Sequence, residues 1–178
     1  MVTLEPGDIV LTRGSAFFSR LIRKLTRSEG EAPTIVNHSG IMVTSEDVVE
    51  SLSRTLNRKF WDVYPEKNKV YVVRKLALSE EHREIVIKKA LSYVGAKYGW
   101  LKILAHGLDR LVFRNRYVVR RLAFMDNYPI CSWVVAYAYF EVGLSFGVHP
   151  NEASPDDIWD WVIEKHPEEW TVVYKGSD

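Results

Sequence analysis

The stretch from residue 37 to residue 51 constrains the fold of this chain more than any other. It holds two apolar runs, Ile41-Met42-Val43 and Val48-Val49, with the polar pair Ser45-Glu46 between them. Short apolar runs joined by a tight polar turn are typical of a β-hairpin. We therefore expect two antiparallel strands here, the first entered through the polar and small residues that precede Ile41.

The rest of the chain alternates between short strands and helices. Apolar runs at residues 9–11, 70–73 and 170–174 predict strands, and helical spacing or cap residues predict helices over residues 17–25, 79–93, 100–125 and 131–142 and from Ser154 onward. This order predicts a mixed α+β fold class. A length of 178 residues suits a single domain over residues 1–178, with a basic helical insertion near residues 100–126.

Composition and charge exclude several classes of protein. The net charge is only +1, so nothing in the overall charge favours nucleic acid as a partner. The chain begins without a basic and apolar leader, and it has no window of about 20 apolar residues that could span a bilayer. We therefore predict a cytoplasmic protein, and we predict neither a cofactor nor a bound metal ion.

The single cysteine, Cys131, is the strongest candidate for chemistry. It follows the break Tyr128-Pro129 and begins an apolar stretch with helical character. The unpaired N–H groups and the dipole of a helix N-terminus stabilise a thiolate and lower its pKa, and they also stabilise an oxyanion. The alternative is an inert buried cysteine, which the apolar neighbours Ile130 and Trp133 favour.

His38 is the candidate base among the five histidines. It stands at the start of an apolar strand beside Ser39 and Gly40, small residues that we expect to leave room for a substrate backbone. Glu50 lies on the returning strand among apolar residues, where a carboxylate needs a partner, and we expect it to orient the imidazole. The alternative for Glu50 is an exposed position on the outer face. The other histidines are expected in loops or on solvated faces: His82, His106, His149 and His166.

Several blocks together resemble the NlpC-like hydrolases of the papain-like superfamily. Residues 37–43 and 48–51 resemble the histidine strand pair of that family. Because the histidine precedes the cysteine in this chain, the order resembles the circularly permuted branch of the superfamily. The further blocks that carry the resemblance are Gly95-Ala96-Lys97-Tyr98 for the Gly-x-x-Tyr motif, Cys131-Ser132 for the Cys-Ser motif, and residues 6–10 and 154–158.

This resemblance implies a papain-like, circularly permuted α+β fold, in which a small antiparallel sheet or barrel packs on the helix that bears the cysteine. It implies Cys131 as nucleophile, His38 as base and Glu50 as orienting residue, with Tyr98 and Ser132 near the oxyanion or the substrate. The implied activity is that of a thiol protease or amidase, a cysteine-dependent hydrolase that cleaves amide or peptide bonds through a thioester acyl-enzyme. The alternatives are a lipid acyltransferase or esterase with the same Cys-His pair, and a non-catalytic binding module.

The segment from residue 100 to residue 125 is basic and amphipathic. It carries Lys102 and five arginines against a single acid, Asp109, with apolar residues interleaved. Such a pattern predicts contact with a membrane surface or with an anionic substrate. The alternative is a helix whose cationic face is simply solvated. The partners we expect are therefore a peptide, amide or acyl-chain substrate and, through this segment, a membrane surface.

Overall fold

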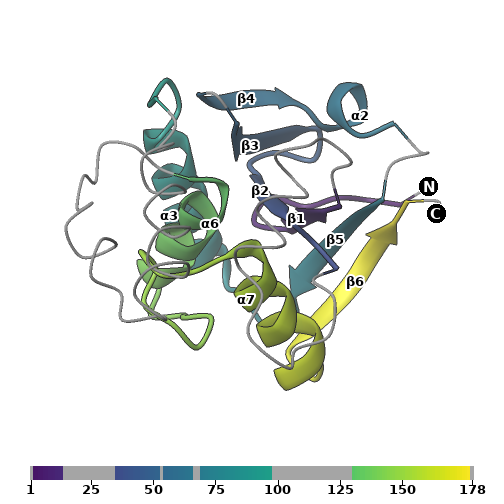
Figure 1. Ribbon diagram of the computed structural model, residues 1–178, viewed down its shortest axis with the longest axis vertical. Coiled ribbons are helices and arrows are strands. Elements are labelled where there is room, and N and C mark those ends of the chain that lie inside the picture. Colours follow the sequence, from purple (N-terminus) through teal and green to yellow (C-terminus); the bar gives the residue numbers. More distant parts are fainter. Residues whose placement is uncertain (1, 14–34, 53, 66–68, 98–129, 177–178) are drawn as a thin grey trace, which may run out of the picture.

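The computed structural model describes residues 2–13, 35–52, 54–65, 69–97 and 130–176. These residues form a six-stranded sheet with the order β4-β3-β2-β1-β5-β6, in which every neighbouring pair is antiparallel (Figure 1). The strands are β1 (Ile9–Thr12), β2 (His38–Met42), β3 (Asp47–Ser51), β4 (Thr55–Lys59), β5 (Val70–Lys75) and β6 (Trp170–Lys175).

Few helices accompany the sheet. In the described part of the chain they are α2 (Phe60–Val63), α3 (Glu80–Ser92), α6 (Cys131–Phe140), α7 (Pro155–Trp159) and the π-helix η1 (Asp160–Lys165). Figure 1 shows α3 and α6 next to each other at one side of the sheet, with α2 at the far end of β4. Ser79 and Ser154 cap the N-termini of α3 and α7 with their side chains.

Strand alternation divides the core into two layers. Ile41 and Val49 belong to a cluster with Val134 and Val135 of α6, on the helical face of the sheet. Their neighbours in sequence point to the opposite face, because successive side chains of a strand alternate. On that second face the core is formed by Val10, Met42, Val48, Phe60, Tyr64, Val70 and Val72 together with Leu4.

The turn that precedes β1 is tied to both α6 and β5. The hydroxyl group of Tyr139 donates a hydrogen bond of 2.6 Å to the carbonyl oxygen of Gly7, which has a φ of +91° that only glycine adopts readily. The buried carboxylate of Asp8 accepts two bonds of 2.8 Å from the guanidinium of Arg74. A bidentate pair of this kind fixes orientation as well as distance. These contacts connect the turn with α6 on one side and with β5 on the other.

Most of the expected elements are present. The hairpin of β2 and β3, the strands β1, β5 and β6, and the helices α3, α6 and α7 lie where the sequence pattern predicted them, within a few residues. The sequence did not predict β4 and α2, which follow β3 directly. The expected helix over residues 17–25 and the expected basic insertion near residues 100–126 lie outside the described residues.

The expected papain-like, circularly permuted fold class is wrong. The described part of the chain is mostly a single antiparallel sheet, in which β1 lies between β2 and β5 and the last described strand, β6, is at the edge. The motifs on which the expectation was based are short. They describe how a strand that carries a histidine meets a helix that carries a cysteine. They did not determine the order of the strands around that contact, which depends on long-range pairing. In the described part of the chain, no helix has both the length and the apolar character needed to cross a membrane.

Candidate active site

Cys131 is the first residue of α6, and its side chain is buried. Ile130 takes the N-cap position in an extended conformation, without a side-chain hydrogen bond to the helix. The first N–H groups of α6 are therefore not occupied by a capping side chain. The sulfur accepts hydrogen bonds from the backbone N–H groups of Ser132, in the first turn, and of Ser39, on β2.

The N–H group of Ser39 is free for the sulfur because strand pairing stops beside it. The amide of Met42 donates to Asp8 on the β1 side, and amides alternate in direction along a strand, so the amide of Ser39 points to the β3 side. The ladder between β2 and β3 begins only at the pair Gly40 and Glu50. The end of this ladder therefore supplies a backbone donor to the cysteine.

His38 lies between the sulfur and a buried carboxylate. Its Nε2 is 2.8 Å from Oε2 of Glu50, and its side chain also forms a hydrogen bond with Cys131. Because Nε2 is engaged by Glu50, Nδ1 is the ring nitrogen left to face the thiol. The three residues thus form a continuous line from sulfur to carboxylate, and the hydrogen bond expected between His38 and Glu50 is present. Their catalytic roles stay predictions.

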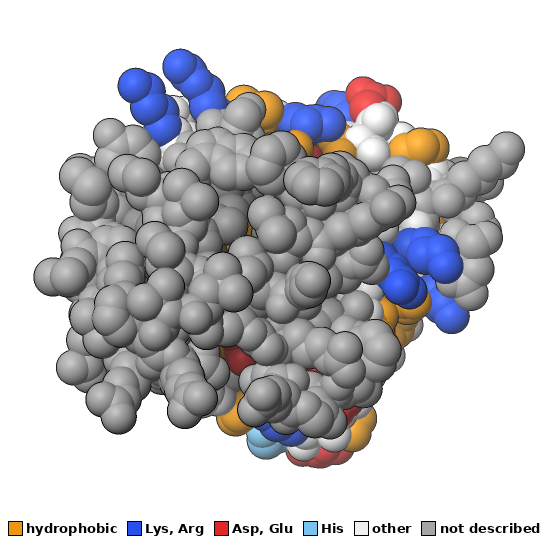
Figure 2. All heavy atoms as spheres, viewed as in Figure 1, with side chains coloured by type: hydrophobic (Ala, Val, Ile, Leu, Met, Phe, Trp, Pro, Cys, Tyr) orange, Lys and Arg blue, Asp and Glu red, His pale blue; other side chains and the backbone are white. Residues whose placement is uncertain are grey.

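Glu50 is almost completely buried, with 1% of its surface exposed. Its Oε2 also accepts a hydrogen bond of 2.5 Å from the hydroxyl group of Tyr64. Its Oε1 lies 3.6 Å from a guanidinium nitrogen of Arg58 on β4, and no described residue donates a hydrogen bond to this oxygen. Figure 2 shows lysine and arginine side chains along the upper margin of the view, on the side where β4 lies. The alternative that Glu50 is exposed on an outer face is therefore wrong.

Gly40 faces Glu50 directly across the hairpin. A Cβ atom at this position would lie 3.0 Å from the carbonyl oxygen of Val49 and 3.3 Å from Cβ of Glu50. The expectation that Gly40 leaves room for a substrate backbone is wrong, because the residue is buried inside the sheet. It leaves room for the carboxylate that binds His38.

The electrostatics of the site favour an ion pair. Burial alone would raise the pKa of Cys131, but the imidazolium of His38 and the N–H groups of Ser39 and Ser132 lower it below its ordinary value. Burial works against the charge on His38, but the thiolate of Cys131 and the carboxylate of Glu50 raise its pKa to about 10. Between these two values the site holds a thiolate and an imidazolium, the reactive form of a cysteine nucleophile.

Glu50 stays ionised and Tyr64 stays protonated in this arrangement. Burial works to raise the pKa of Glu50, but the bonds from His38 and Tyr64 and the charge of Arg58 lower it. Burial and the neighbouring carboxylate both raise the pKa of Tyr64 well above its ordinary value. The phenol therefore remains a donor to the carboxylate over the whole neutral range.

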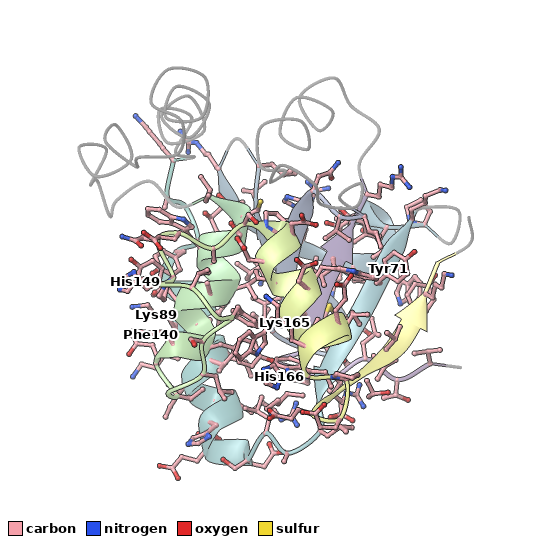
Figure 3. All side chains as sticks on the ribbon, turned by 60° about the horizontal axis from the view of Figure 1, so that its bottom comes forward. Tyr71, Lys89, Phe140, His149, Lys165 and His166 are labelled. Atoms are coloured by element: carbon pink, nitrogen blue, oxygen red, sulfur yellow. The ribbon has the colours of Figure 1, made fainter. Side chains whose placement is uncertain are left out.

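The other expected site residues have different fates. The side chain of Ser132 is committed to the carbonyl oxygen of Ala153, at 2.6 Å, so only its backbone faces the sulfur. Tyr98 and the basic segment 100–125 lie outside the described residues. Among the other histidines, His82 is on the exposed side of α3, and Figure 3 shows His149 beside Phe140 and His166 at the end of η1. His106 falls outside the described residues.

Tyr64 and Arg58 were missed in the sequence. Both depend on β4 and α2, which bring them back over Glu50 after a second reversal of the chain. The segment over residues 54–64 mixes polar and apolar residues without clear alternation, so it gave no strand signal. A separation of fourteen residues between Glu50 and Tyr64 has no meaning until that reversal is known.

Comparison with known proteins gives a fold relationship. No family model and no curated protein matched the sequence. The structure is similar to the crystal structure of the metalloprotein yiiX from Escherichia coli O157:H7, DUF1105, with a TM-score of 0.67 over 99% of this chain and 99% of that chain. The two sequences are 19% identical, so the chain shares the fold of that protein, and the similarity extends no further than the fold.

This similarity overturns the expected family. The assignment to the circularly permuted, NlpC-like branch of the papain-like superfamily is wrong, and with it the description of the chain as an NlpC-like thiol protease, because the matching structure is a DUF1105 protein. The assignment relied on blocks of two to seven residues. A histidine at the start of a strand and a cysteine at the start of a helix can meet in more than one fold, so these blocks do not identify a family.

The residues at Cys131 do not fit a metal centre. The ligand atoms of a metal site lie on one side, around the ion, whereas Cys131 and Glu50 approach opposite nitrogens of His38. In the described residues, the group with metal-ligand spacing is His166, Glu168 and Glu169, at the surface near η1. There Lys75 forms an ion pair with Glu169. We therefore derive no metal-dependent step for this chain.

Proposed function

We propose that this chain is a cysteine-dependent hydrolase that cleaves amide or peptide bonds through a thioester acyl-enzyme. In this proposal Cys131 is the nucleophile, His38 is the general acid and base, and Glu50 orients the imidazole. The single observation that carries the proposal is the continuous line Cys131–His38–Glu50, with a raised pKa on the histidine and a lowered pKa on the thiol. An inert core cysteine has no need of a buried, charged partner on the adjacent strand.

The first half of the reaction uses the ion pair as it stands. The thiolate of Cys131 attacks the carbonyl carbon, a C–S bond forms, and negative charge develops on the carbonyl oxygen. The candidate donor to that oxygen is the backbone N–H group of Cys131, because Ile130 offers no capping side chain and the N–H groups of Ser132 and Trp133 already bind the sulfur and the carbonyl oxygen of Ile130. His38 then gives its Nδ1 proton to the leaving nitrogen, and the C–N bond breaks to release an amine and leave a thioester.

The second half regenerates the ion pair. Neutral His38 removes a proton from a water molecule, the resulting hydroxide oxygen bonds to the thioester carbon, and the C–S bond breaks. The products are a carboxylic acid and the thiolate of Cys131 facing a protonated His38. Throughout both halves Glu50 accepts the Nε2 hydrogen of His38, which keeps the ring in one orientation and stabilises the imidazolium.

The same residues also support ester cleavage or transfer of an acyl group to an acceptor other than water. The acylation half is identical, and the outcome depends on which nucleophile reaches the thioester. A non-catalytic binding module is disfavoured by the buried charges of Glu50 and His38, which are costly to retain unless they serve a purpose.

Intact-mass measurement of the acyl-enzyme tests the proposal. The full chain is incubated with p-nitrophenyl acetate, and a set of peptide coumarinyl amides then tests amide cleavage. We expect one acetyl group on the native protein, none on Cys131→Ala, and slower acetylation of His38→Ala. The matched control is His82→Ala, which changes a histidine on the exposed side of α3. Acetylation that persists in Cys131→Ala, or that is equally fast in His38→Ala and His82→Ala, overturns the proposal.

A further inference from the structure

Tyr64 and His38 share one oxygen of the buried carboxylate. The hydroxyl group of Tyr64 is 2.5 Å from Oε2 of Glu50, and Nε2 of His38 is 2.8 Å from the same atom. Tyr64 itself is buried, with 6% of its surface exposed. Tyr64 forms its hydrogen bond with Glu50 and not with the thiol, so beyond the direct electrostatic interaction between Tyr64 and Cys131 its influence on the thiol passes through Glu50 and His38.

The position of Tyr64 is fixed independently of its hydroxyl group. The N–H group of Tyr64 donates to the carbonyl oxygen of Phe60, at 2.8 Å, and closes the short helix α2. Phe60 in turn donates its N–H group to the carbonyl oxygen of Glu46 in the hairpin turn, and the rings of Phe60 and Tyr64 are 5.4 Å apart. The ring therefore packs in the second core layer with Met42 and Val48, and the hydroxyl group arrives at Glu50 preorganised.

We propose that Tyr64 is a positioning residue for the reaction at Cys131, acting by holding the Glu50 carboxylate in the one orientation that aims His38 at the sulfur. This inference rests on the proposed function of the Cys131–His38–Glu50 line. A carboxylate on a flexible side chain has several orientations, and two donors that converge on one oxygen select one of them.

The hydrogen bond from Tyr64 matters because few other groups bind the carboxylate of Glu50. The groups that face the carboxylate are His38 from β2, Arg58 from β4 and Tyr64 from the end of α2, and Cys131 of α6 interacts electrostatically with Tyr64. Arg58 is the weakest of the three partners, because it lies 3.6 Å away and 37% of its side chain is exposed to screening solvent. Tyr64 is thus the only described partner besides His38 that forms a hydrogen bond to the carboxylate of Glu50.

The substitution Tyr64→Phe removes this one donor and keeps the packed ring. A hydrogen bond to a carboxylate stabilises its charged form, so the loss of this bond is expected to raise the pKa of Glu50. A carboxylate that is no longer held in one orientation supports the imidazolium of His38 less well. The alkaline limb of the pH–rate profile, set by the imidazolium, should therefore move to lower pH, while the acid limb, set by the thiol of Cys131, moves less.

The experiment measures Glu50 directly and the reaction separately. The carboxyl carbon of Glu50 is followed by 13C NMR against pH in the full chain and assigned by its absence in Glu50→Gln. The acetylation rate of Cys131 by p-nitrophenyl acetate is recorded over the same pH range. The matched control is Tyr139→Phe, which also removes a buried tyrosine hydroxyl with a hydrogen bond of 2.6 Å, but one made to the carbonyl oxygen of Gly7.

In Tyr64→Phe we expect the Glu50 titration to move to higher pH and the alkaline limb to move to lower pH, with both unchanged in Tyr139→Phe. In a Glu50→Gln background, Tyr64→Phe should cost no further activity, because the two residues act in one line. A Glu50 titration unmoved by Tyr64→Phe overturns the inference, and so does a loss of activity that is additive with Glu50→Gln. If Tyr64→Phe does not fold, the native protein is measured instead. The inference then requires that Glu50 titrates below its ordinary range and that the hydroxyl proton of Tyr64 is protected from exchange. If Cys131→Ala still becomes acetylated, the proposed function fails, and the NMR result on Glu50 remains a separate outcome.

Discussion

Removal of the imidazole of His38 should convert Cys131 from a reactive thiolate into an ordinary buried thiol. The pKa of His38 is raised from 6.5 to about 10 against the effect of burial, by Cys131 and by Glu50. Cys131 is the larger of these two causes, so at least half of the net increase of about 3.5, or about two, comes from the interaction with the thiolate. The interaction is reciprocal, so His38→Ala should raise the pKa of the thiol by about the same amount.

The rate of alkylation reports this change. At a pH below both midpoints, an increase of about two in the pKa lowers the thiolate fraction about 100-fold. A more basic thiolate is a better nucleophile. With a Brønsted coefficient of about 0.4–0.5, the rate constant of the thiolate rises by a factor of about six to ten, which offsets part of this loss. The net expectation for His38→Ala is alkylation by iodoacetamide about 10- to 15-fold slower than in the native protein.

The assay needs no substrate and has one possible target. Cys131 is the only cysteine of the chain. Under conditions in which iodoacetamide modifies cysteine alone, every alkyl group detected by intact mass therefore belongs to it. Rates are recorded from acidic to alkaline pH for the native protein, for His38→Ala and for His82→Ala, whose histidine lies on the exposed side of α3. Equal midpoints in the native protein and His38→Ala would refute the reasoning, and alkylation that becomes fast only in denaturant would show an inert core cysteine.

Gly40→Ala places a Cβ atom 3.3 Å from Cβ of Glu50, so acetylation of Cys131 should fall at least about tenfold while circular dichroism shows a folded protein that is destabilised by about 1–3 kcal/mol. Glu50→Gln removes a carboxylate that raises the pKa of His38, so the alkaline limb of the pH–rate profile should move below about 10. The free energy of unfolding, measured by chemical denaturation, should show a plateau between about pH 6.5 and 9. The raised pKa of His38 loses its contribution to this free energy as pH rises through about 10. The lowered pKa of Cys131 loses its contribution as pH falls through the folded value. The same titration of His38→Ala should lack the alkaline fall.

The sequence predicted the parts of the site that are encoded locally. The β2–β3 hairpin follows from two apolar runs and a polar turn, and this hairpin alone brings Glu50 opposite Gly40 and next to His38. The helical start at Cys131 follows from a proline break and an apolar run. Local signals of this kind are sufficient because each involves residues that are close along the chain.

The rest could not be predicted because it depends on long-range packing. Tyr64 reaches Glu50 only after β4 has paired with β3 and α2 has turned back over the second face, and neither element has a clear periodicity. The strand order could not be predicted for the same reason, since β1 pairs with both β2 and β5, and the second pairing joins residues about sixty positions apart. Short motifs carry no information on such pairings, whereas the buried polar network depends on all of them.

The site therefore belongs to both faces of the sheet at once. Cys131 comes from α6 on the helical face. Glu50 points to the opposite face, as Val48 does two positions earlier on β3, and Tyr64 packs in the core layer of that face. His38 connects the two because it is the first residue of β2, where the ladder with β3 has not yet begun and the ring can reach past the end of the sheet to the sulfur. A change in α2 can thus alter the reactivity of Cys131 without touching it, since the imidazole of His38 connects the two layers. A nucleophile built wholly on α6 would respond to the packing of that helix alone, and the contrast between Tyr64→Phe and Tyr139→Phe separates these two designs.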